Sequence, residues 1–297
     1  MRPYHWLQAI LLSTIILGQV TPATADTVIK TKNNIDTSKP EISFSLTPGI
    51  AFFFYKEYVR EENNKAFMDI TGPLYGIETS LRINLNPKGI IGLTLIPFDI
   101  AFYGGTKLNY KSFAEQKNAA GQFERYLPYG SLNFANEQMF LFWYRTLAGP
   151  SFNFLNDYRI SLLSGYGYKY TLARTTEDPS YGDRQNLMSY VPLAMQFQYK
   201  KDHLDIIAHA EYDIFLGGLQ KTVSVHSVTK VPYNVEHRQP ASSGRGARAS
   251  LEISYYGATI APFFNYFWID DSEPAPTESV EPRNVTIETG AKIGYKF

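Results

Sequence analysis

Hydrophobic and polar residues alternate without a break over residues 284–297, the last fourteen of the chain. Val285, Ile287, Ile293, Tyr295 and Phe297 lie at odd positions, whereas the even positions from 286 on carry Thr, Glu, Gly and Lys. Because successive side chains of a strand point to opposite faces, this pattern predicts a strand with one apolar and one polar face. Such a strand suits a membrane barrel, which meets lipid outside and encloses a polar lumen.

The same two-residue period recurs along the chain. It predicts an all-β transmembrane antiparallel up-and-down barrel of about ten strands, each at least as long as the roughly nine to eleven residues that a tilted membrane strand needs. The predicted strands are residues 42–58, 68–84, 90–103, 132–147, 158–174, 187–200, 204–217, 245–256, 258–269 and 285–297.

The predicted connections alternate between short and long, as they do in outer-membrane barrels. Short connections fall at 86–89, 148–156, 201–203 and Gly257, and long ones at 104–130, 175–186, 219–244 and 270–284. An even strand number lets the sheet close without a free edge in lipid.

Four prolines lie inside the predicted strands. Pro48, Pro97, Pro192 and Pro262 each lack a backbone donor, so each predicts a bulge or a position near the barrel rim. They leave some strand boundaries open by several residues, and eight or twelve strands remain as alternatives.

The first 40 residues predict export. Arg2 precedes an apolar stretch over residues 6–20, and small residues at Ala23 and Ala25 form a cleavage site. This pattern predicts a signal peptide, residues 1–25, cleaved after Ala25, with an uncleaved anchor as the alternative. Residues 26–40 are then a polar periplasmic segment, residues 41–297 the barrel, and the bacterial cell outer membrane the compartment.

Composition agrees with a barrel wall. The chain has 22 Tyr and 20 Phe and no net charge, yet its mean hydropathy is only −0.23. Alternating lipid-facing and lumen-facing residues keep the average hydropathy ordinary, while aromatic residues gather at the membrane interfaces. The chain contains no cysteine, which excludes disulfides and thiol catalysis.

Taking the more apolar parity as lipid-facing places many charged residues in the lumen. Opposite signs are interspersed, as in Glu78 with Arg82, Arg248 with Glu252, and Glu288 with Lys292. In a narrow interior such charges are tolerated when paired or hydrated, so we expect a cross-lumen salt-bridge network. The predicted lumen residues are Glu57, Glu78, Arg82, Asp99, Glu137, Arg145, Arg159, Lys169, Asp205, His209, Glu211, Asp213, Arg248, Glu252, Glu288 and Lys292.

His209, Glu211 and Asp213 form the densest part of this set, at alternate positions of one predicted strand. A metal site or a His–carboxylate catalytic pair is geometrically conceivable there. One histidine among carboxylates is a poor zinc signature, and structural ion networks shift pKa values as active sites do. We therefore expect a structural role, with no catalytic residue, cofactor or metal.

Several short motifs resemble a widespread, functionally uncharacterised family of proteobacterial outer-membrane β-barrel proteins. They are GPLYGI at 72–77, DIAFYGGT at 99–106, GYGYKY at 165–170, EYDIFLGG at 211–218, and WIDDSEP and EPRN near the end. Lys169 stands where the family commonly has Arg, which keeps a cation but loses bidentate pairing. The resemblance implies the fold and the localisation and no catalytic residues. The final strand also resembles the assembly signal of outer-membrane proteins, which implies that Tyr295 and Phe297 are read by the barrel-assembly machinery.

Two classes of function follow. The first is a nonenzymatic barrel with a narrow, charge-filled lumen and long extracellular loops, acting as a structural protein, a surface-binding protein or a narrow solute channel. The alternative is an outer-membrane hydrolase, either an omptin-like protease or a lipid hydrolase. Asp270 and Asp271 offer an acidic pair, but no Asp-x-His element accompanies them, and no His lies on the lipid-facing parity of a predicted strand. Expected partners are outer-membrane lipid and lipopolysaccharide, the assembly machinery and an unidentified extracellular ligand, without nucleic acid.

Overall fold

The computed structural model describes residues 39–59, 65–118, 122–155, 157–175, 183–225, 232–274 and 280–297. All of them belong to one unit of the chain, Asp36–Phe297. The predicted signal peptide and its cleavage site lie outside the described residues. Only Lys39 and Pro40 of the predicted periplasmic segment are described.

Long antiparallel strands make up the described chain. Within the described residues, ten of them form the barrel wall, and three short strands, β4, β5 and β10, lie beyond it or extend it. The strands are β1 (Glu41–Val59), β2 (Lys65–Leu85), β3 (Ile91–Ser112), β4 (Glu115–Lys117), β5 (Phe123–Tyr126), β6 (Leu132–Phe154), β7 (Tyr158–Arg174), β8 (Asp183–Lys201), β9 (Leu204–Val225), β10 (Pro232–Gln239), β11 (Gly244–Tyr255), β12 (Ala258–Ile269) and β13 (Arg283–Lys296).

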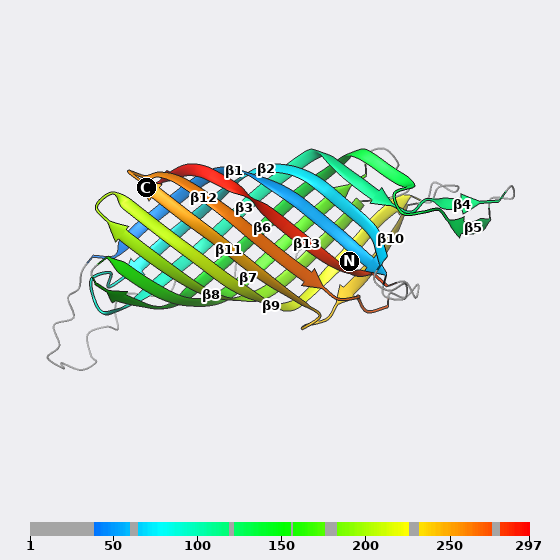
Figure 1. Ribbon diagram of the computed structural model, residues 1–297. Coiled ribbons are helices and arrows are strands. Elements are labelled where there is room, and N and C mark those ends of the chain that lie inside the picture. The colour runs from blue at the N-terminus through cyan, green and yellow to red at the C-terminus, as the bar shows by residue number, and fades with distance from the viewer. Residues whose placement is uncertain are drawn as a thin grey trace. The chain divides into compact units, whose positions relative to one another are not determined.

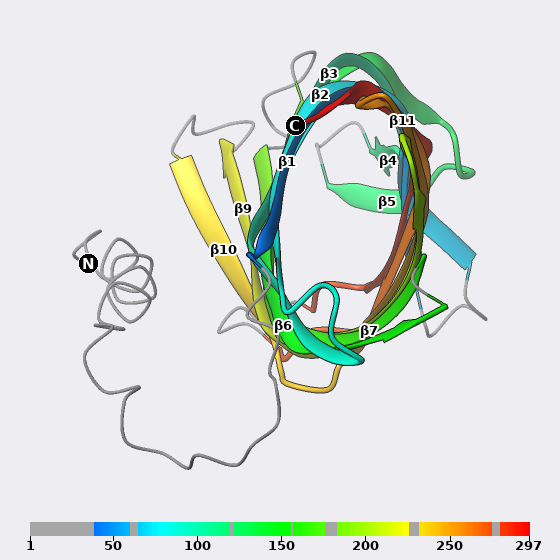
Figure 2. The same ribbon diagram turned by 90° about the vertical axis from the view of Figure 1, so that its left-hand side faces the viewer.

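The sheet closes on itself. Each wall strand pairs with its neighbours along the chain, and β13 pairs with β1 to complete the ring. The closed ring of crossing, tilted strands is visible in Figure 1, and Figure 2 shows it from one end. The predicted fold class is confirmed, including the strand number.

One strand has two successive partners. The first part of β9 pairs with β11 and its later part with β10, so β10 continues the wall beyond the end of β11. The change follows a bulge where Leu216 is an extra residue opposite Ser189 and Tyr190. Gly217 has a φ of 142° there, a conformation that residues with a side chain rarely adopt.

The two ends of the barrel differ, as the connection lengths predict. Tight turns join β2 to β3, β6 to β7, β8 to β9 and β11 to β12, and the C-terminus lies at the same end (Figure 1). At the other end the strands run further than the sequence predicts. The segment 104–130 holds the end of β3 and the β4–β5 pair, and the segment 219–244 holds the end of β9 and β10. None of the described segments forms a helix long and apolar enough to cross a membrane.

Only one of the four prolines lies at a bulge. The register shifts between Ile96 and Asp99, around Pro97, whereas it stays regular through Pro48, Pro192 and Pro262. The expectation of a bulge or rim position at each proline was therefore wrong for these three. Each keeps its backbone pairing with one neighbouring strand and loses it with the other, so the flanking pairs hold the strand in register.

The outer wall is apolar and rich in aromatic residues. Ile50, Phe52, Ile77, Leu193 and Phe264 are among the large side chains exposed there. At the tight-turn end, aromatic rings form a girdle. Its ring centroids lie 5.5 Å apart for Phe154 and Tyr158, 5.0 Å for Tyr158 and Tyr199, and 4.9 Å for Tyr295 and Phe297. An apolar band with an aromatic girdle matches a lipid-facing surface, and the chain is a transmembrane barrel of the outer-membrane type.

The interior is less uniformly charged than the sequence suggests. A buried apolar cluster lines the inner face of β1, β2, β3 and β6 and includes Phe53, Met68, Leu74, Tyr103 and Trp143. Parity does not predict this cluster, because those strands are apolar on both faces. Two smaller apolar clusters, around Ile96 and Leu147 and around Met188 and Phe215, accompany the charged residues elsewhere in the interior.

Candidate functional site in the barrel lumen

The structure places the predicted lumen charges inside the barrel. Arg82, Arg145, Arg159 and Glu252 are half-buried. The other predicted lumen residues are buried: Glu57, Glu78, Asp99, Glu137, Lys169, Asp205, His209, Glu211, Asp213, Arg248, Glu288 and Lys292. Alternation along each strand brings them to the same face, and closure of the ring brings them together.

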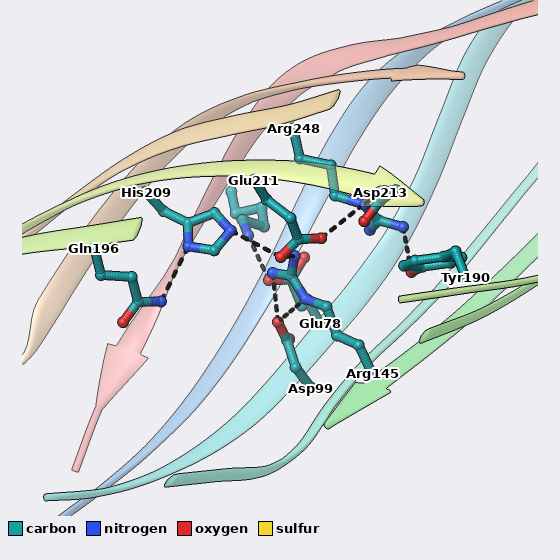
Figure 3. A network of polar contacts seen from close by, with 10 residues as sticks. Glu78, Asp99, Arg145, Tyr190, Gln196, His209, Glu211, Asp213 and Arg248 are labelled. Atoms are coloured by element: carbon teal, nitrogen blue, oxygen red, sulfur yellow. Dashed lines mark hydrogen bonds and ion pairs between the residues drawn. The ribbon is translucent and has the colours of Figure 1, made fainter. Parts of the chain in front are cut away.

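Arg145 on β6 lies at the centre of this interior. Its Nη2 donates to Oδ2 of Asp99 on β3 at 2.7 Å, and its Nη1 donates to Oε2 of Glu211 on β9 at 2.7 Å. Figure 3 shows Arg145 between the two carboxylates. One guanidinium therefore joins strands that are not neighbours in the wall. Such charge-assisted hydrogen bonds are stronger than neutral ones.

Both ring nitrogens of His209 are occupied. Nε2 lies 3.1 Å from Oε2 of Glu211, and Nδ1 lies 3.1 Å from Nε2 of Gln196 on β8 (Figure 3). Because the Gln196 amide nitrogen is a donor, Nδ1 accepts and Nε2 carries the proton that is donated to Glu211. The imidazole is thus fixed in one tautomer within the network.

Arg248 on β11 completes the centre. Its Nε donates to Oδ2 of Asp213 at 3.0 Å and lies 3.3 Å from Oε1 of Glu211, and its Nη2 donates to the hydroxyl of Tyr190. The guanidinium also lies 5.3 Å from the ring centroid of Trp143, while that of Arg145 lies 5.1 Å from the same ring. Aromatic faces therefore stabilise cations that have lost their water.

Further ion pairs span the lumen at other levels. Lys169 on β7 contacts Glu288 on β13 at 2.5 Å, and these strands lie on opposite sides of the ring. Near the long-loop end Arg184 on β8 binds Glu57 on β1, and Thr175 donates to Glu137 at 2.9 Å.

Toward the tight-turn end, Lys296 contacts Asp205 at 2.8 Å and Glu252 at 2.9 Å. At the entrance, Arg159 contacts Glu41 at 3.2 Å. We call this whole set of polar contacts the lumen network.

The pairings differ from those that the sequence suggests. Glu78 binds Lys292 at 2.5 Å rather than Arg82, which makes no ion pair among the described residues. Arg248 binds Asp213 and Glu211 rather than Glu252, and Glu288 binds Lys169 rather than Lys292. Residues four apart on a strand share a face but lie about 13 Å apart, too far to pair directly.

Several members of the lumen network were missed by the sequence analysis. Arg184 and Glu281 fall in segments predicted as loops. Arg184 lies two residues before Asn186, so both side chains point to the same face of β8. Extending the alternation by one step would have predicted that Arg184 points inward. Gln196 and Tyr190 are neutral, so a search for charges overlooks them. Glu281, which precedes β13, lies 3.8 Å from Arg184 and has no periodic signal.

Little free space remains beside the central ion pairs. A cavity of about 60 Å³ lies beside the lumen network, lined by Glu78, Arg82, Asp99, His209 and Lys292 among others. This volume suffices for a water or two, since one liquid water takes about 30 Å³.

The chemistry available to this site is limited. Ser250 faces His209 across the β9–β11 ladder, but both imidazole nitrogens already have other partners, so neither is open to activate its hydroxyl. Within the described ranges, no group of three or more His, Asp or Glu side chains is arranged to hold a metal ion. Of the acidic pair, Asp271 accepts a hydrogen bond from the Arg283 amide at 2.8 Å.

The predicted assembly residues lie at the closing seam. Phe297 exchanges both backbone hydrogen bonds with Phe44 of β1, at 2.8 and 3.2 Å. Its ring centroid lies 4.9 Å from that of Tyr295 and 6.2 Å from that of Phe44. The last residue therefore forms the end of the pairing that closes the barrel.

No protein-family model matches the chain, and no curated protein matches it. Among solved structures, the outer membrane protease OmpT from Escherichia coli is 11% identical, with 86% of this chain and 96% of that chain covered and a TM-score of 0.49.

Ail, the attachment invasion locus protein of Yersinia pestis, is 13% identical over 86% of this chain and 99% of that chain, with a TM-score of 0.29. The Ralstonia pickettii toluene transporter TbuX is 10% identical over 86% and 89%, with a TM-score of 0.33. A protease, an attachment protein and a transporter at this distance say nothing about activity. The closed ring and its lipid-facing wall carry the conclusion that the chain is an outer-membrane β-barrel.

Proposed function

We propose that this protein is a nonenzymatic outer-membrane barrel with a closed lumen, which acts through the strands and loops it presents outside the cell. The observation that carries the proposal is the lumen network. Its ion pairs join opposite walls, and the cavity beside them measures about 60 Å³. A solute path would have to break pairs whose members are buried, and removing one partner of such a pair costs about 3–5 kcal/mol.

The long-loop end supports a role in binding at the surface. β3, β6 and β9 contain 22, 23 and 22 residues, about twice the number that a tilted strand needs to cross the hydrocarbon. Their excess lies at the end opposite the C-terminus, where β4 and β5 project beyond the ring (Figure 1). Long, rigidly supported loops of this kind commonly carry recognition.

Membership of the uncharacterised proteobacterial barrel family remains part of this proposal, supported by the motifs in the sequence. The alternative is a hydrolase. It is disfavoured by the occupied nitrogens of His209 and by the role of Asp271 in capping a backbone amide.

Planar-bilayer recording of the purified, refolded barrel tests the closed lumen. We expect no steady conductance from the wild type. The double variant Asp99→Ala/Arg145→Ala removes both members of one central pair and enlarges the cavity, while Glu211 keeps its contacts with His209 and Arg248. This variant should show openings that the wild type lacks.

Lys221→Ala serves as the matched control, because Lys221 contacts Glu236 at 3.7 Å in a solvent-exposed pair on β9 and β10. Its traces should match those of the wild type. Large, stable openings in the wild type would contradict the closed lumen, whatever the double variant does.

A further inference from the structure

A groove of about 660 Å³ lies on the outer wall of the barrel, over β2, β3, β6 and β7. It is separate from the lumen network, and exposed side chains such as Tyr75 and Phe140 line it. A membrane barrel normally presents a smooth wall of large side chains to lipid. This depression is therefore a specific feature of the wall.

Strand register builds the floor of the groove. Tyr75 on β2 pairs with Gly104 on β3, Gly104 pairs with Phe140 on β6, and Phe140 pairs with Leu172 on β7. A glycine thus lies between two aromatic residues in one row, which leaves a slot between their rings. A Cβ atom added at Gly104 would meet nothing closer than the Met139 carbonyl oxygen at 3.7 Å, so the slot is open.

Bulges widen the groove just above this row. The register shifts between Thr71 and Tyr75 on β2 and between Gly105 and Leu108 on β3. Pro73, between the first two, also lines the groove. The shifts interrupt the regular ladder and the row of side chains at this height.

The side of the groove toward the long loops is polar and cationic. Gln138 on β6 pairs with Arg174 on β7, one position above Phe140 and Leu172, and Lys107 lies above Gly104 on β3. Lys107 is exposed and makes no ion pair with any described residue. Arg174 uses Nε to contact Asp183 at 3.1 Å, and its terminal amino groups bind none of the described residues. Arg174 thus balances the charge of Asp183. Because Lys107 has no such partner, this side of the groove carries a net positive charge.

An apolar slot below two cations fits a lipid whose head group carries phosphate. An acyl chain would lie between Tyr75 and Phe140, and burial of apolar surface would hold it. Arg and Lys donate charge-assisted hydrogen bonds to phosphate oxygens. The long-loop end of such a barrel faces the cell exterior, so the lipid belongs to the outer leaflet, where lipopolysaccharide is found.

We propose that this groove is a binding site for lipopolysaccharide, with one lipid A acyl chain over Gly104 and a lipid A phosphate at Lys107 and Arg174. A second groove in the wall provides a comparison for the first. It has a similar volume of about 650 Å³ and apolar lining residues such as Leu162, Leu193 and Met195, but no Lys or Arg lines it. It lacks the charge complementarity that the first groove has.

Native mass spectrometry of the detergent-purified protein, titrated with lipid A, tests the site. We expect one lipid A to remain bound to the wild type. Gly104→Trp fills the slot, and Lys107→Gln/Arg174→Gln removes the cations. Each should weaken binding by about tenfold or more, equivalent to about 1.4 kcal/mol. Lipid A without phosphates should bind the wild type as weakly as lipid A binds the cation variant.

Ala148→Trp is the matched control, because it places the same large ring in the second groove. It should bind lipid A as the wild type does. All variants are first checked for barrel folding by heat-modifiable migration, and the cation variant changes only exposed positions. Equal binding by the wild type and the cation variant would overturn the proposal. Equally tight binding of phosphatidylglycerol would overturn the assignment to lipopolysaccharide.

Discussion

At the scale of single residues, the lumen network shows how buried charge is tolerated in a membrane protein. Several central groups have more than one partner. Glu211 contacts Arg145, Arg248 and His209. Removing one member of such a network leaves its former partners buried without compensation, which is costly. Its effect on barrel stability is therefore measurable one residue at a time.

His209→Ala should lower the free energy of unfolding by about 1–3 kcal/mol, because Gln196 and Glu211 each lose a hydrogen-bond partner in a buried setting. Denaturant unfolding of the barrel in lipid vesicles measures the change. Ser250→Ala is the control. Ser250 lies opposite His209, but its hydroxyl forms no hydrogen bond with the described residues, so removing the hydroxyl should be close to neutral.

The same variants distinguish the two classes of function. Peptides, phospholipids and lipopolysaccharide incubated with the wild type should remain intact. Turnover by the wild type that disappears in His209→Ala, with stability unchanged, would show that the site is catalytic.

At the scale of elements, the closing seam between β13 and β1 differs from the other strand pairs. Its two strands are furthest apart in the chain, so it forms only when the whole ring is in place. The pairing extends past Lys296 to Phe297, whose backbone and ring both contact Phe44. The last residue therefore combines a structural contact with the position of the predicted assembly signal.

Deletion of Phe297 should reduce assembly in cells more than loss of one hydrogen-bonded pair explains. The reason is that it removes the residue that we expect the assembly machinery to read. The fraction of heat-modifiable protein in isolated outer membranes measures assembly. Phe297→Trp, which keeps the backbone contacts and an aromatic ring, should restore most of it. Equal assembly of the deleted and intact chains would argue against the signal.

At the scale of the whole molecule, the barrel and its projecting hairpin are joined by few contacts. The hairpin consists of β4 and β5, and two backbone hydrogen bonds close its base. The Leu127 amide donates to the Ala114 carbonyl at 2.9 Å, and the Gly130 amide donates to the Ser112 carbonyl at 3.0 Å. The ring itself is held by continuous ladders around its circumference. Stability should therefore reside in the ring.

Replacing residues 115–126 with a two-glycine link should leave the barrel intact, because the ends that the link must join already lie within hydrogen-bonding distance. The shortened protein should still migrate to the outer membrane and change mobility on heating. Its unfolding midpoint should match that of the full chain. A shortened chain that is always fully denatured on gels would mean that the hairpin contributes to the fold.

Much of this architecture could be read from the sequence. Alternation predicted the strand number and which side chains turn inward, because the direction of a side chain in a strand is a local property with a period of two. Strand ends were less well predicted. β3 and β9 run past their predicted ends at 103 and 217 toward the long loops, and β6 runs past its predicted end at 147 toward the tight turns. Leu108, Tyr110 and Gln220 are still buried in these extensions, because packing inside the barrel continues beyond the stretch that a membrane crossing requires.

The tertiary structure decided which residues meet. Glu78 pairs with Lys292, a residue 214 positions away, because the stagger and closure of the ring set the height of each inward position. The groove over Gly104 has the same origin, since it depends on the register of four strands and on bulges between them. Period-two alternation determines the face of each side chain, but only the closed, staggered ring determines its neighbours.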